Sequence, residues 1–402
     1  HKAVVTLDTT RMAQLLEIDE VSHTATFQCG IWGPDLEDRL QSEGWTLGHY
    51  PQSFEFSTLG GWIAARGAGQ QSNRYGAANK WLVAARLATP TGEWRTLPFP
   101  QSAAGPDMNE LIAGSEGVLG VITEATVKIH RLPETRDYRA YLFKSFEAGA
   151  AVVREIVQAG VGVAMMRLSD AEETHFFGTF KNLIKPPSRV EKNAEKVLGK
   201  AGYGAGRCVL MIGLEGAKSD VRHALARTLW IATRGGGLPV GQGPGHAWYE
   251  QRFAMPYLRD PMLDRGIGID TLETSTGWGN LPRLYDGVRA AIRAELGPNS
   301  GVLTHISHSY ADGASLYFTY IFARDLDDEL AQWVRVKRAA SEAISKLGGT
   351  ISHHHGVGKD HAEWFATEKG ALAVDLLSDA KKTVDPTGIL NPRKMLSDEI
   401  LG

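Results

Sequence analysis

Two stretches rich in glycine and other small residues constrain the fold of this chain more than any other feature. The first runs from Pro51 to Gly69 and the second from Gly114 to Gly120. Small residues let backbone N–H groups approach a phosphate, a ribityl chain or a flat ring that a Cβ atom would keep away. One Gly-Gly pair would indicate only a tight turn. Two such stretches indicate a bulky ligand, and a planar redox cofactor is one ligand of that kind.

The composition limits the classes of function. A chain of 402 residues exceeds one compact domain, so two domains are expected. The 43 Lys and Arg residues nearly balance 46 Asp and Glu residues, and a net charge of −3 gives no general attraction to nucleic acid or anionic membranes. The two cysteines, Cys29 and Cys208, have no disulfide or metal-binding spacing, which fits a reducing compartment. Without a long apolar run or a signal-peptide pattern, we expect a soluble protein.

Residue periodicity predicts a mixture of strands and helices. Alternating or β-prone residues predict strands at 3–8, 25–29, 125–130, 141–143, 208–212 and 316–322. Apolar residues at helical spacing predict helices at 34–44, 146–157, 221–229 and 330–347, and another that ends near Val384. Repeated strand and helix units after Pro133 predict an antiparallel sheet covered on one face. The polar stretch Lys181–Lys200 is expected to be a mobile surface loop.

Three consecutive histidines, His353, His354 and His355, form a second group of chemical interest. On an extended segment only His353 and His355 would point to the same side. Imidazole exchanges protons near neutral pH, which favours acid–base catalysis. A metal-binding tract and plain surface composition are the alternatives.

Residues 52–62 and 114–123 resemble the second and third FAD-binding segments of the alkyldihydroxyacetonephosphate synthase family, which has the FAD-binding fold of the vanillyl-alcohol oxidase superfamily. The resemblance covers nearly the whole chain, including Asp385-Pro386 and Ile389–Lys394, which is similar to the family's terminal motif. It implies an α+β fold with an FAD-binding domain at 1–133 that lacks its N-terminal part, a cap domain at 134–350 built on an antiparallel sheet covered by helices, and a C-terminal segment at 351–402 returning to the FAD domain. The family's earlier glycine-rich loop, which binds the FAD pyrophosphate, is expected on a segment before His1.

The resemblance implies that FAD is held mainly by main-chain groups of three segments. Ser57, Thr58 and Arg66 are the side chains expected to contribute most. The expected cofactor-binding residues are Gln52, Ser53, Phe54, Glu55, Phe56, Ser57, Thr58, Ala65, Arg66, Gly67, Ala68, Glu116, Gly117, Val118, Leu119, Gly120, Val121 and Ile122.

By the same resemblance, Tyr317 and His353, His354 and His355 are catalytic. Arg259 is expected to bind the substrate phosphate, and Arg167 matches a second functional arginine of the family. A guanidinium suits a phosphate because its planar fork of donors stays charged. A tyrosine in an aromatic strand is otherwise more often a core residue, and an ion pair with Asp260 or Asp264 is the alternative for Arg259.

The implied activity is a flavin-dependent exchange of the acyl group of acyl-dihydroxyacetone phosphate for a long-chain alcohol, which makes an ether lipid without net electron transfer. The expected partners are the lipid phosphate and the fatty alcohol, with no nucleic acid. Peripheral membrane contact through Lys181–Lys200 is a hypothesis, and a homodimer is a further expectation. The expected location is cytoplasmic or peripheral to a membrane, with an organellar address on a preceding segment as the alternative.

An FAD-linked oxidase or dehydrogenase of a 2-hydroxy acid, such as lactate or glycolate, is the alternative function. Such enzymes usually hold a metal between a His-x-Gly-Asp-Gly-Asn element and a Glu-His-Gly element, where this chain has Ser309–Ala314 and His354–Gly356. No metal site is assigned, although His305 and His308 leave one open. A cofactor-free binding protein is the third class, which would lack a yellow chromophore.

Overall fold

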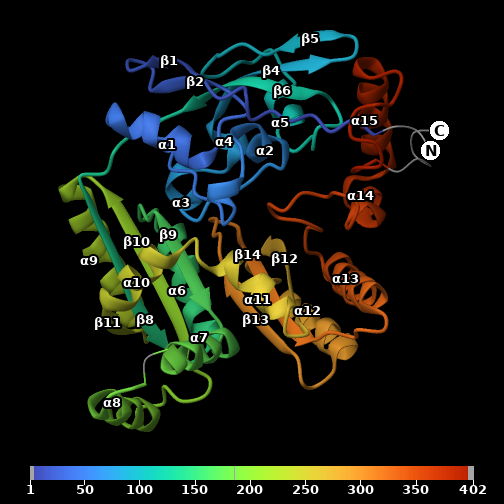
Figure 1. Cartoon of the computed structure of the whole chain (residues 1–402). Coiled ribbons are helices and arrows are strands. Elements are labelled where there is room, and N and C mark those ends of the chain that lie inside the picture. Colours follow the sequence, from blue (N-terminus) through green and yellow to red (C-terminus); the bar gives the residue numbers. More distant parts are fainter. Residues whose placement is uncertain (1–3, 185, 397–402) are drawn as a thin grey trace. The chain divides into compact units, whose positions relative to one another are not determined.

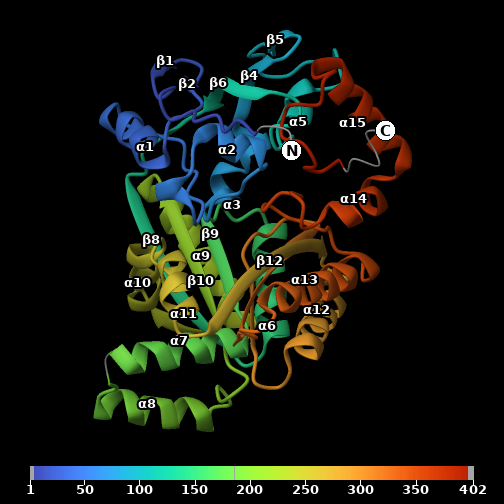
Figure 2. The same ribbon diagram turned by 45° about the vertical axis from the view of Figure 1, so that its right-hand side comes forward.

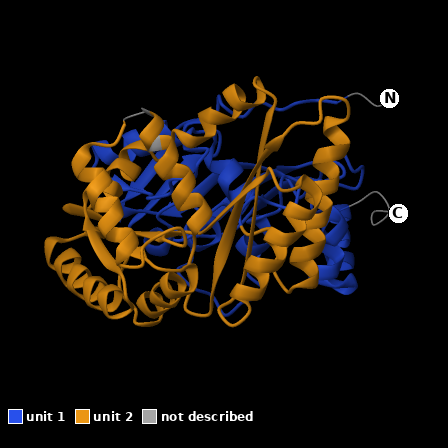
Figure 3. Ribbon diagram, turned by 90° about the horizontal axis from the view of Figure 1, so that it is seen from below, with its two compact units in different colours: residues 1–132, 354–402 blue, residues 133–353 orange. Residues whose placement is uncertain are grey.

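The computed structural model describes residues 4–184 and 186–396. The chain divides into two compact units, which Figure 3 shows in different colours: unit 1 comprises residues 1–132 and 354–402, and unit 2 comprises residues 133–353. The end of unit 2 lies three residues beyond the predicted domain end at residue 350. The backbone N–H of His353 donates to the carbonyl of Glu273, 3.1 Å away, which holds these residues in unit 2.

Unit 1 is built on an antiparallel sheet with the strand order β1-β2-β6-β4-β5 (Figure 1). Its strands are β1 (Leu15–Asp19), β2 (Thr24–Gln28), β4 (Leu82–Thr89), β5 (Gly92–Arg95) and β6 (Val121–Lys128), with β3 (Trp45–Thr46) paired to β7 (His130–Arg131). Its helices are α1 (Gly33–Ser42), η1 (Phe54–Phe56), α2 (Leu59–Ala64), α3 (Ser72–Tyr75), α4 (Ala78–Trp81), α5 (Met108–Ile112), α14 (Ala362–Lys369) and α15 (Ala371–Val384).

The first predicted strand of unit 1 is wrong. Residues 4–8 form no strand, and Ala3 lies outside the described residues. Asp8 instead accepts hydrogen bonds from the N–H of Thr10 at 2.9 Å and from its hydroxyl at 2.6 Å, which makes a local turn. The first strand is β1, which pairs with the predicted strand β2. β-Prone residues form a strand only where a partner strand is available.

Unit 2 is built on a longer antiparallel sheet with the order β11-β8-β10-β9-β13-β14-β12. Its strands are β8 (Thr135–Phe143), β9 (Met165–Ser169), β10 (Cys208–Gly216), β11 (Leu238–Gly241), β12 (Ile267–Gly277), β13 (Gly301–Ile306) and β14 (Gly313–Ala323). Its helices are α6 (Phe146–Gln158), α7 (Ala171–Ile184), α8 (Arg189–Lys200), α9 (Lys218–Arg234), α10 (Gly243–Gln251), η2 (Met255–Leu258), α11 (Arg259–Leu263), α12 (Leu281–Leu296) and α13 (Glu329–Lys346).

The two faces of the unit 2 sheet differ in polarity. Leu316, Phe318 and Tyr320 of β14 are completely buried in one hydrophobic core with apolar residues of α6, α9, α12 and α13. Figure 2 shows α12 beside α13 in this layer. Because side chains alternate along a strand, Tyr317 lies on the opposite face. The predicted antiparallel sheet covered by helices is therefore confirmed, but helices are not confined to one face, because Tyr249 of α10 packs on Tyr138 at the second face. Polar residues lie on that second face around Tyr317.

The prediction of a surface loop at Lys181–Lys200 is wrong for most of that segment. Residues up to Ile184 belong to α7 and residues 189–200 form α8, while Lys185 lies outside the described residues. The hydroxyl of Ser188 accepts from the N–H of Glu191 at 3.2 Å, and the carboxylate of Glu191 accepts from the N–H of Ser188 at 2.8 Å. This capping box allows a polar segment without buried residues to form a helix.

Two predicted absences can be compared with the described part of the chain. Cys29 and Cys208 are both buried and free, so they form no disulfide. None of the helices among the described residues is long and apolar enough to cross a bilayer.

Candidate active site

The predicted flavin-binding segments are joined to one another within unit 1. Gln52–Thr58 contains η1, Ala65–Ala68 follows α2, and Glu116–Ile122 leads into β6. The N–H of Gly114 donates to the carbonyl of Ile63 and the N–H of Glu116 to that of Ala64, both at 2.9 Å. The second and third segments are therefore held side by side by their main chains.

Two residues of these segments have an unusual backbone conformation. Arg66 has a φ of 53° and Glu116 a φ of 49°, beside Gly114 at 95° and Gly117 at 78°. A positive φ is uncommon for a residue other than glycine and costs conformational energy, so such residues tend to gather at functional sites. This conformation turns the main chain sharply at both segments.

The side chains of Ser57, Thr58 and Arg66, predicted to contribute most to FAD binding, also form bonds within unit 1. The hydroxyl of Ser57 accepts from the indole N–H of Trp62 at 2.6 Å. Thr58 caps α2 by accepting from the N–H of Gly61 at 3.3 Å. The guanidinium of Arg66 forms an ion pair with Glu110.

Buried polar atoms and close backbone packing in unit 1 test whether the residues fit FAD. Among the described residues, no hydrogen-bond partner is present for the buried hydroxyl of Ser115 or for either ring nitrogen of buried His49. A Cβ on Gly60 would lie 3.0 Å from Cys29, so packing within unit 1 accounts for this glycine. Burial lowers the pKa of His49 to about 3, so this imidazole is neutral. The unpartnered atoms of Ser115 and His49 fit a cofactor that offers them uncharged polar partners.

Glu116 connects the third flavin segment to the chain that follows the three histidines. Its carboxylate accepts hydrogen bonds from the N–H of Val357 and, at 2.8 Å, from that of Gly358. Its carbonyl accepts a hydrogen bond from the side-chain amide of Asn391. The N–H of Met395 donates to the carbonyl of Gly358 at 3.1 Å. The predicted terminal motif therefore supports both segments of unit 1.

In unit 2, four neighbouring strands place polar side chains on the sheet face opposite the hydrophobic core. Tyr317 of β14 lies opposite Glu273 of β12 on one side and opposite His305 of β13 on the other. His305 in turn lies opposite Ser169 of β9. Residues directly opposite in adjacent strands share a face. The antiparallel register therefore brings these groups together from distant parts of the sequence.

Arg167, Glu173 and His305 form a closed triangle of contacts. Oε1 of Glu173 accepts from a guanidinium nitrogen of Arg167 at 2.9 Å and lies 3.0 Å from Nδ1 of His305. Nε2 of His305 lies 3.0 Å from Arg167. Asp170 starts α7 by accepting from the N–H of Glu173 at 2.7 Å, which places Glu173 in the first turn of that helix. Arg167 is therefore held in one orientation by buried groups.

The charges in this triangle follow from burial and from the fixed guanidinium charge. Burial alone would raise the pKa of Glu173, but Arg167 and His305 outweigh it and bring the pKa to about 2. Burial and Arg167 lower the pKa of His305. At neutral pH we therefore assign a carboxylate to Glu173 and a neutral ring to His305.

Tyr317 is oriented by two contacts on the same face. Its ring stacks on that of His305 with 4.8 Å between centroids and 16° between planes. Its side chain is hydrogen-bonded to Thr271, and burial raises its pKa to about 12. Tyr317 is therefore a neutral phenol at physiological pH.

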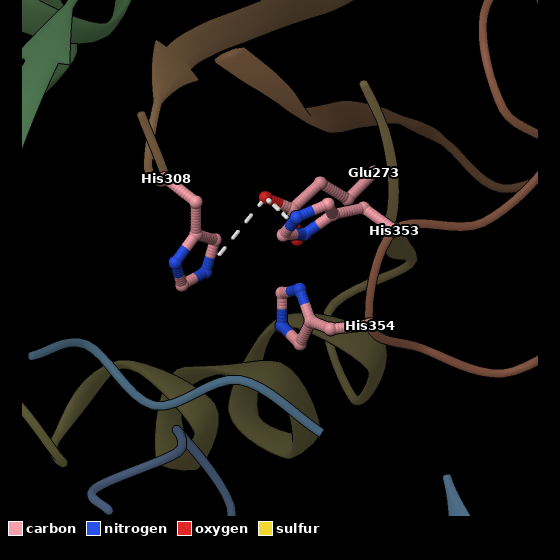
Figure 4. Close-up of side chains that lie close together, drawn as sticks. All are labelled: Glu273, His308, His353 and His354. Carbon is pink, nitrogen blue, oxygen red and sulfur yellow. Dashed lines mark ion pairs between the residues drawn. The ribbon is translucent and has the colours of Figure 1, made fainter. Parts of the chain in front are cut away.

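Glu273, which lies opposite Tyr317 in the sheet, is close to His308 and His353 (Figure 4). Oε1 of Glu273 lies 3.6 Å from Nδ1 of His353 and 4.0 Å from Nε2 of His308. Nε2 of His353 is 2.7 Å from the hydroxyl of Tyr310. His354, also drawn in Figure 4, is the next residue along the chain and the first of its segment of unit 1.

The remaining predicted residues have other surroundings. The expectation that His353 and His355 share one side assumed an extended segment, but residues 353–355 form bends. The rings of His354 and exposed His355 meet edge to face, 4.5 Å apart. Arg259 is exposed at the start of α11. In the described part of the chain, no ion pair joins Arg259 to Asp260 or Asp264.

Sequence reasoning missed His49, Glu173, Glu273 and Tyr310. Glu173 lies six residues after Arg167 in the chain. The sequence could have placed it near Arg167 only if a helix had been predicted to begin directly after the strand that carries Arg167. Glu273 could have been found as a charged residue inside the β-prone run Ile269–Thr276, since a charge within a strand needs a polar face or a partner.

Two family models match the chain. The model described as the C-terminal domain of FAD-linked oxidases matches residues 132–395, which is more than half of the chain. The model described as an FAD binding domain matches residues 1–98.

Relatives extend the match to almost the whole chain. The alkyldihydroxyacetonephosphate synthase of Dictyostelium discoideum is 34% identical over 98% of this chain and 66% of its own length. That of Caenorhabditis elegans is 32% identical over 100% of this chain and 69% of its own length. Glycolate oxidase subunit GlcD of Bacillus subtilis is 27% identical over 96% of this chain and 78% of its own length. This chain thus spans just under two thirds of the Dictyostelium relative.

Solved structures agree with these matches. A structure of an alkyldihydroxyacetonephosphate synthase has a TM-score of 0.79 at 33% identity, covering 96% of this chain and 68% of that one. p-Cresol methylhydroxylase, at 14% identity, has a TM-score of 0.70, covering 96% of this chain and 78% of that one, and shares the fold. This chain therefore belongs to the alkyldihydroxyacetonephosphate synthase family, and its cofactor is FAD.

Proposed function

We propose that the protein to which this chain belongs is an alkyldihydroxyacetonephosphate synthase, which exchanges the acyl group of acyl-dihydroxyacetone phosphate for a long-chain alcohol. The observation that carries the proposal is the face of the unit 2 sheet on which Arg167, His305 and Tyr317 contact one another. This face combines a fixed cation for an anionic substrate with a neutral proton donor.

The cofactor would be held by the joined segments of unit 1, chiefly through the main chain around Gly61, Gly67 and Gly117. Ser115 and His49 offer uncharged polar atoms to it. When bound, FAD supplies an electron-accepting ring that can stabilise negative charge on the substrate carbon.

Two arginines would recognise the substrate phosphate. Arg259 is exposed, so its full donor fork is available to a phosphate monoester. Arg167 is already bound to Glu173 and His305, so it would direct its remaining donors in one fixed direction.

Tyr317 and the three histidines would transfer the protons of the reaction. In the exchange, the bond between the substrate carbon and the acyl ester oxygen breaks, and the fatty acid leaves as a carboxylate with both of its oxygens. The alcohol oxygen forms the new bond to that carbon and releases its proton. Because Tyr317 is a neutral phenol, its Oη would donate a proton, while the imidazoles of His353, His354 and His355 would accept one.

The lipid substrates require contact with a membrane, and we propose α7 and α8 for it. The side chain of Leu183 in α7 is 78% exposed, and those of Val190 and Val197 in α8 are 77% and 66% exposed. Lys192 and Lys196 also belong to α8. An exposed apolar stripe beside lysines suits an interface with anionic lipids.

Val190→Ser combined with Val197→Ser should lower flotation of the full-length enzyme with anionic liposomes. Leu372→Ser on exposed α15 is the control, and equal flotation of all three proteins would refute the assignment.

The activity is tested with the full-length, FAD-loaded enzyme. Incubation with palmitoyl-dihydroxyacetone phosphate and hexadecanol should give the hexadecyl ether and free palmitate in equal amounts, measured by mass spectrometry. Bleaching of the flavin absorbance by lactate or glycolate, without ether product, would instead support the 2-hydroxy acid alternative. The expected homodimer is checked separately by sedimentation velocity.

A further inference from the structure

The side chains of Lys381 and Asp385 form an ion pair in the interior of unit 1. Lys381 lies in the last turn of α15, and Asp385 is the first residue after that helix. The side chain of Lys381 is only 4% exposed, and that of Asp385 is completely buried. Removing two charges from water is costly, so a buried ion pair is weak evidence of stabilisation. The groups that this pair binds indicate its use.

The pair fixes the main chain of the turn that follows α15. The carboxylate of Asp385 accepts hydrogen bonds from the N–H of Ile389 at 3.1 Å and from that of Leu390 at 2.8 Å. Nζ of Lys381 donates to the carbonyl of Leu390 at 2.7 Å. Residues 386–389 are exposed, so burial of their side chains contributes little to holding the turn. The ion pair therefore determines the path of this segment.

The turn leads directly to a contact with the third predicted flavin segment. Asn391 follows Leu390, and its side-chain amide donates to the carbonyl of Glu116. A Cβ on Gly117 would lie 3.7 Å from the same amide nitrogen, which places Asn391 against both residues. Asn391 is itself exposed and has a φ of 38°, a conformation that needs support from the surrounding structure. The residues before Asn391 therefore set its direction.

We propose that Lys381 and Asp385 are positioning residues for the cofactor: they hold the turn so that Asn391 keeps the Glu116–Ile122 segment in the conformation that binds FAD. Both act through Asn391 and not by contact with FAD. The inference rests on the assignment of Glu116–Ile122 to the cofactor and does not depend on the transferase reaction. Because linkage is reciprocal, a turn that strengthens FAD binding must itself be held more firmly when FAD is bound.

Hydrogen exchange in the unmutated full-length enzyme tests this reciprocity. The FAD-loaded enzyme and the same enzyme after removal of FAD are compared by mass spectrometry, in peptides that contain the N–H groups of Ile389 and Leu390. We expect these groups to exchange about 10-fold more slowly with FAD bound. Equal exchange of the turn in both forms, while peptides of Glu116–Ile122 are protected by FAD, would contradict the proposal. Absence of protection in Glu116–Ile122 itself would remove the cofactor assignment, and the proposal with it.

Variants separate positioning from stability. Lys381→Met removes the donor to Leu390 and one partner of the pair, whereas Asp385→Asn removes the charge and keeps one acceptor oxygen. Each should raise the rate of FAD release, followed by flavin fluorescence, by about 10-fold. Val374→Ala is the matched control, because it leaves a cavity at a buried position of the same helix. It should lower Tm and leave FAD release unchanged.

FAD release is measured at a temperature at which circular dichroism shows that every variant is folded. Release from Lys381→Met and Asp385→Asn that is no faster than from Val374→Ala would overturn the proposal, since a pair that only stabilises α15 would behave like the control. If neither variant folds, the hydrogen-exchange comparison of the unmutated enzyme decides alone. Ether formation is no part of either measurement, so a failure of the proposed reaction would leave both results unchanged.

Discussion

The carboxylate of Glu116 accepts the backbone N–H of Gly358 at 2.8 Å, which joins a predicted flavin-binding segment to the chain just after the three histidines. The same carboxylate accepts the N–H of Val357. A residue predicted to line the cofactor therefore also fixes the position of the segment that carries His354 and His355. Changes at Glu116 should affect both segments together.

Glu116→Gln should lower the free energy of unfolding by about 1–2 kcal/mol, because an amide can accept only one of the two N–H groups. It should also weaken FAD retention. Thermal unfolding and flavin content after gel filtration measure the two effects. Glu43→Gln, at an exposed end of α1, is the control and should change neither. Full FAD retention in a destabilised Glu116→Gln protein would show that Glu116 stabilises the fold without contributing to cofactor binding.

Tyr317→Phe should lower kcat by about 10²–10⁴-fold with little change in FAD binding, because it removes the proton donor and keeps the ring that stacks on His305. Loss of the hydrogen bond to Thr271 should cost about 1 kcal/mol of stability. Tyr320→Phe is a matched control from the same strand. It loses a 2.9 Å hydrogen bond to Asp270 on the opposite face and should retain kcat. Equal kcat values for the two variants would exclude Tyr317 from catalysis.

Glu173→Gln should destabilise the protein at neutral pH and change its response to acid. Because the pKa of Glu173 falls from 4.5 to about 2 on folding, its carboxylate stabilises the native state above pH 4.5. That contribution, on the order of 3 kcal/mol, is lost as the pH falls towards 2. Tm measured from pH 7 to pH 3 should therefore fall less steeply for Glu173→Gln.

Glu342→Gln is the control for that experiment. Glu342 also has a lowered pKa, but its pair with Lys346 is exposed, so its loss should hardly change Tm at any pH. If Glu173→Gln and Glu342→Gln behaved alike, the buried triangle around Arg167 would contribute nothing to stability.

Asn391→Asp should be more harmful than Asn391→Gly. Asn391 has a φ of 38°, a conformation that Asn, Asp and Gly all tolerate, and its amide donates to the carbonyl of Glu116. Aspartate would place a negative charge against that carbonyl, whereas glycine only removes the donor. Tm and FAD retention should be highest for the unmutated protein, lower for Asn391→Gly and lowest for Asn391→Asp. The reverse order for the two variants would show that backbone freedom matters more than the hydrogen bond.

Residue periodicity predicted most elements but not always their buried faces. The strand at 316–322 is β14, and the alternation of Leu316, Tyr317 and Phe318 separates its two faces correctly. Apolar spacing would bury Leu376 of α15, but Leu376 is 72% exposed, while Lys381 is buried in an ion pair with Asp385. A lysine paired with a carboxylate can enter a core, and apolar spacing gives no sign of that.

The relations between site residues depended on strand register, which local sequence does not determine. His305, Tyr317 and Glu273 are consecutive neighbours across three strands, although helices and loops of different lengths separate them in the chain. Arg167 and Tyr317 were predicted through family resemblance. Glu173 and Glu273, which surround them, had no motif to mark them and needed the folded sheet.

The division of the chain into units has a consequence for biosynthesis. Unit 2 is continuous from residue 133 to residue 353, whereas unit 1 needs residues 354–402 to be complete. As the polypeptide leaves the ribosome, unit 2 can fold before unit 1 has received Asn391 and Met395, whose bonds to Glu116 and Gly358 form only after unit 2 has been translated. A nascent chain stalled before residue 391 should therefore contain a protease-resistant unit 2 and incorporate no flavin.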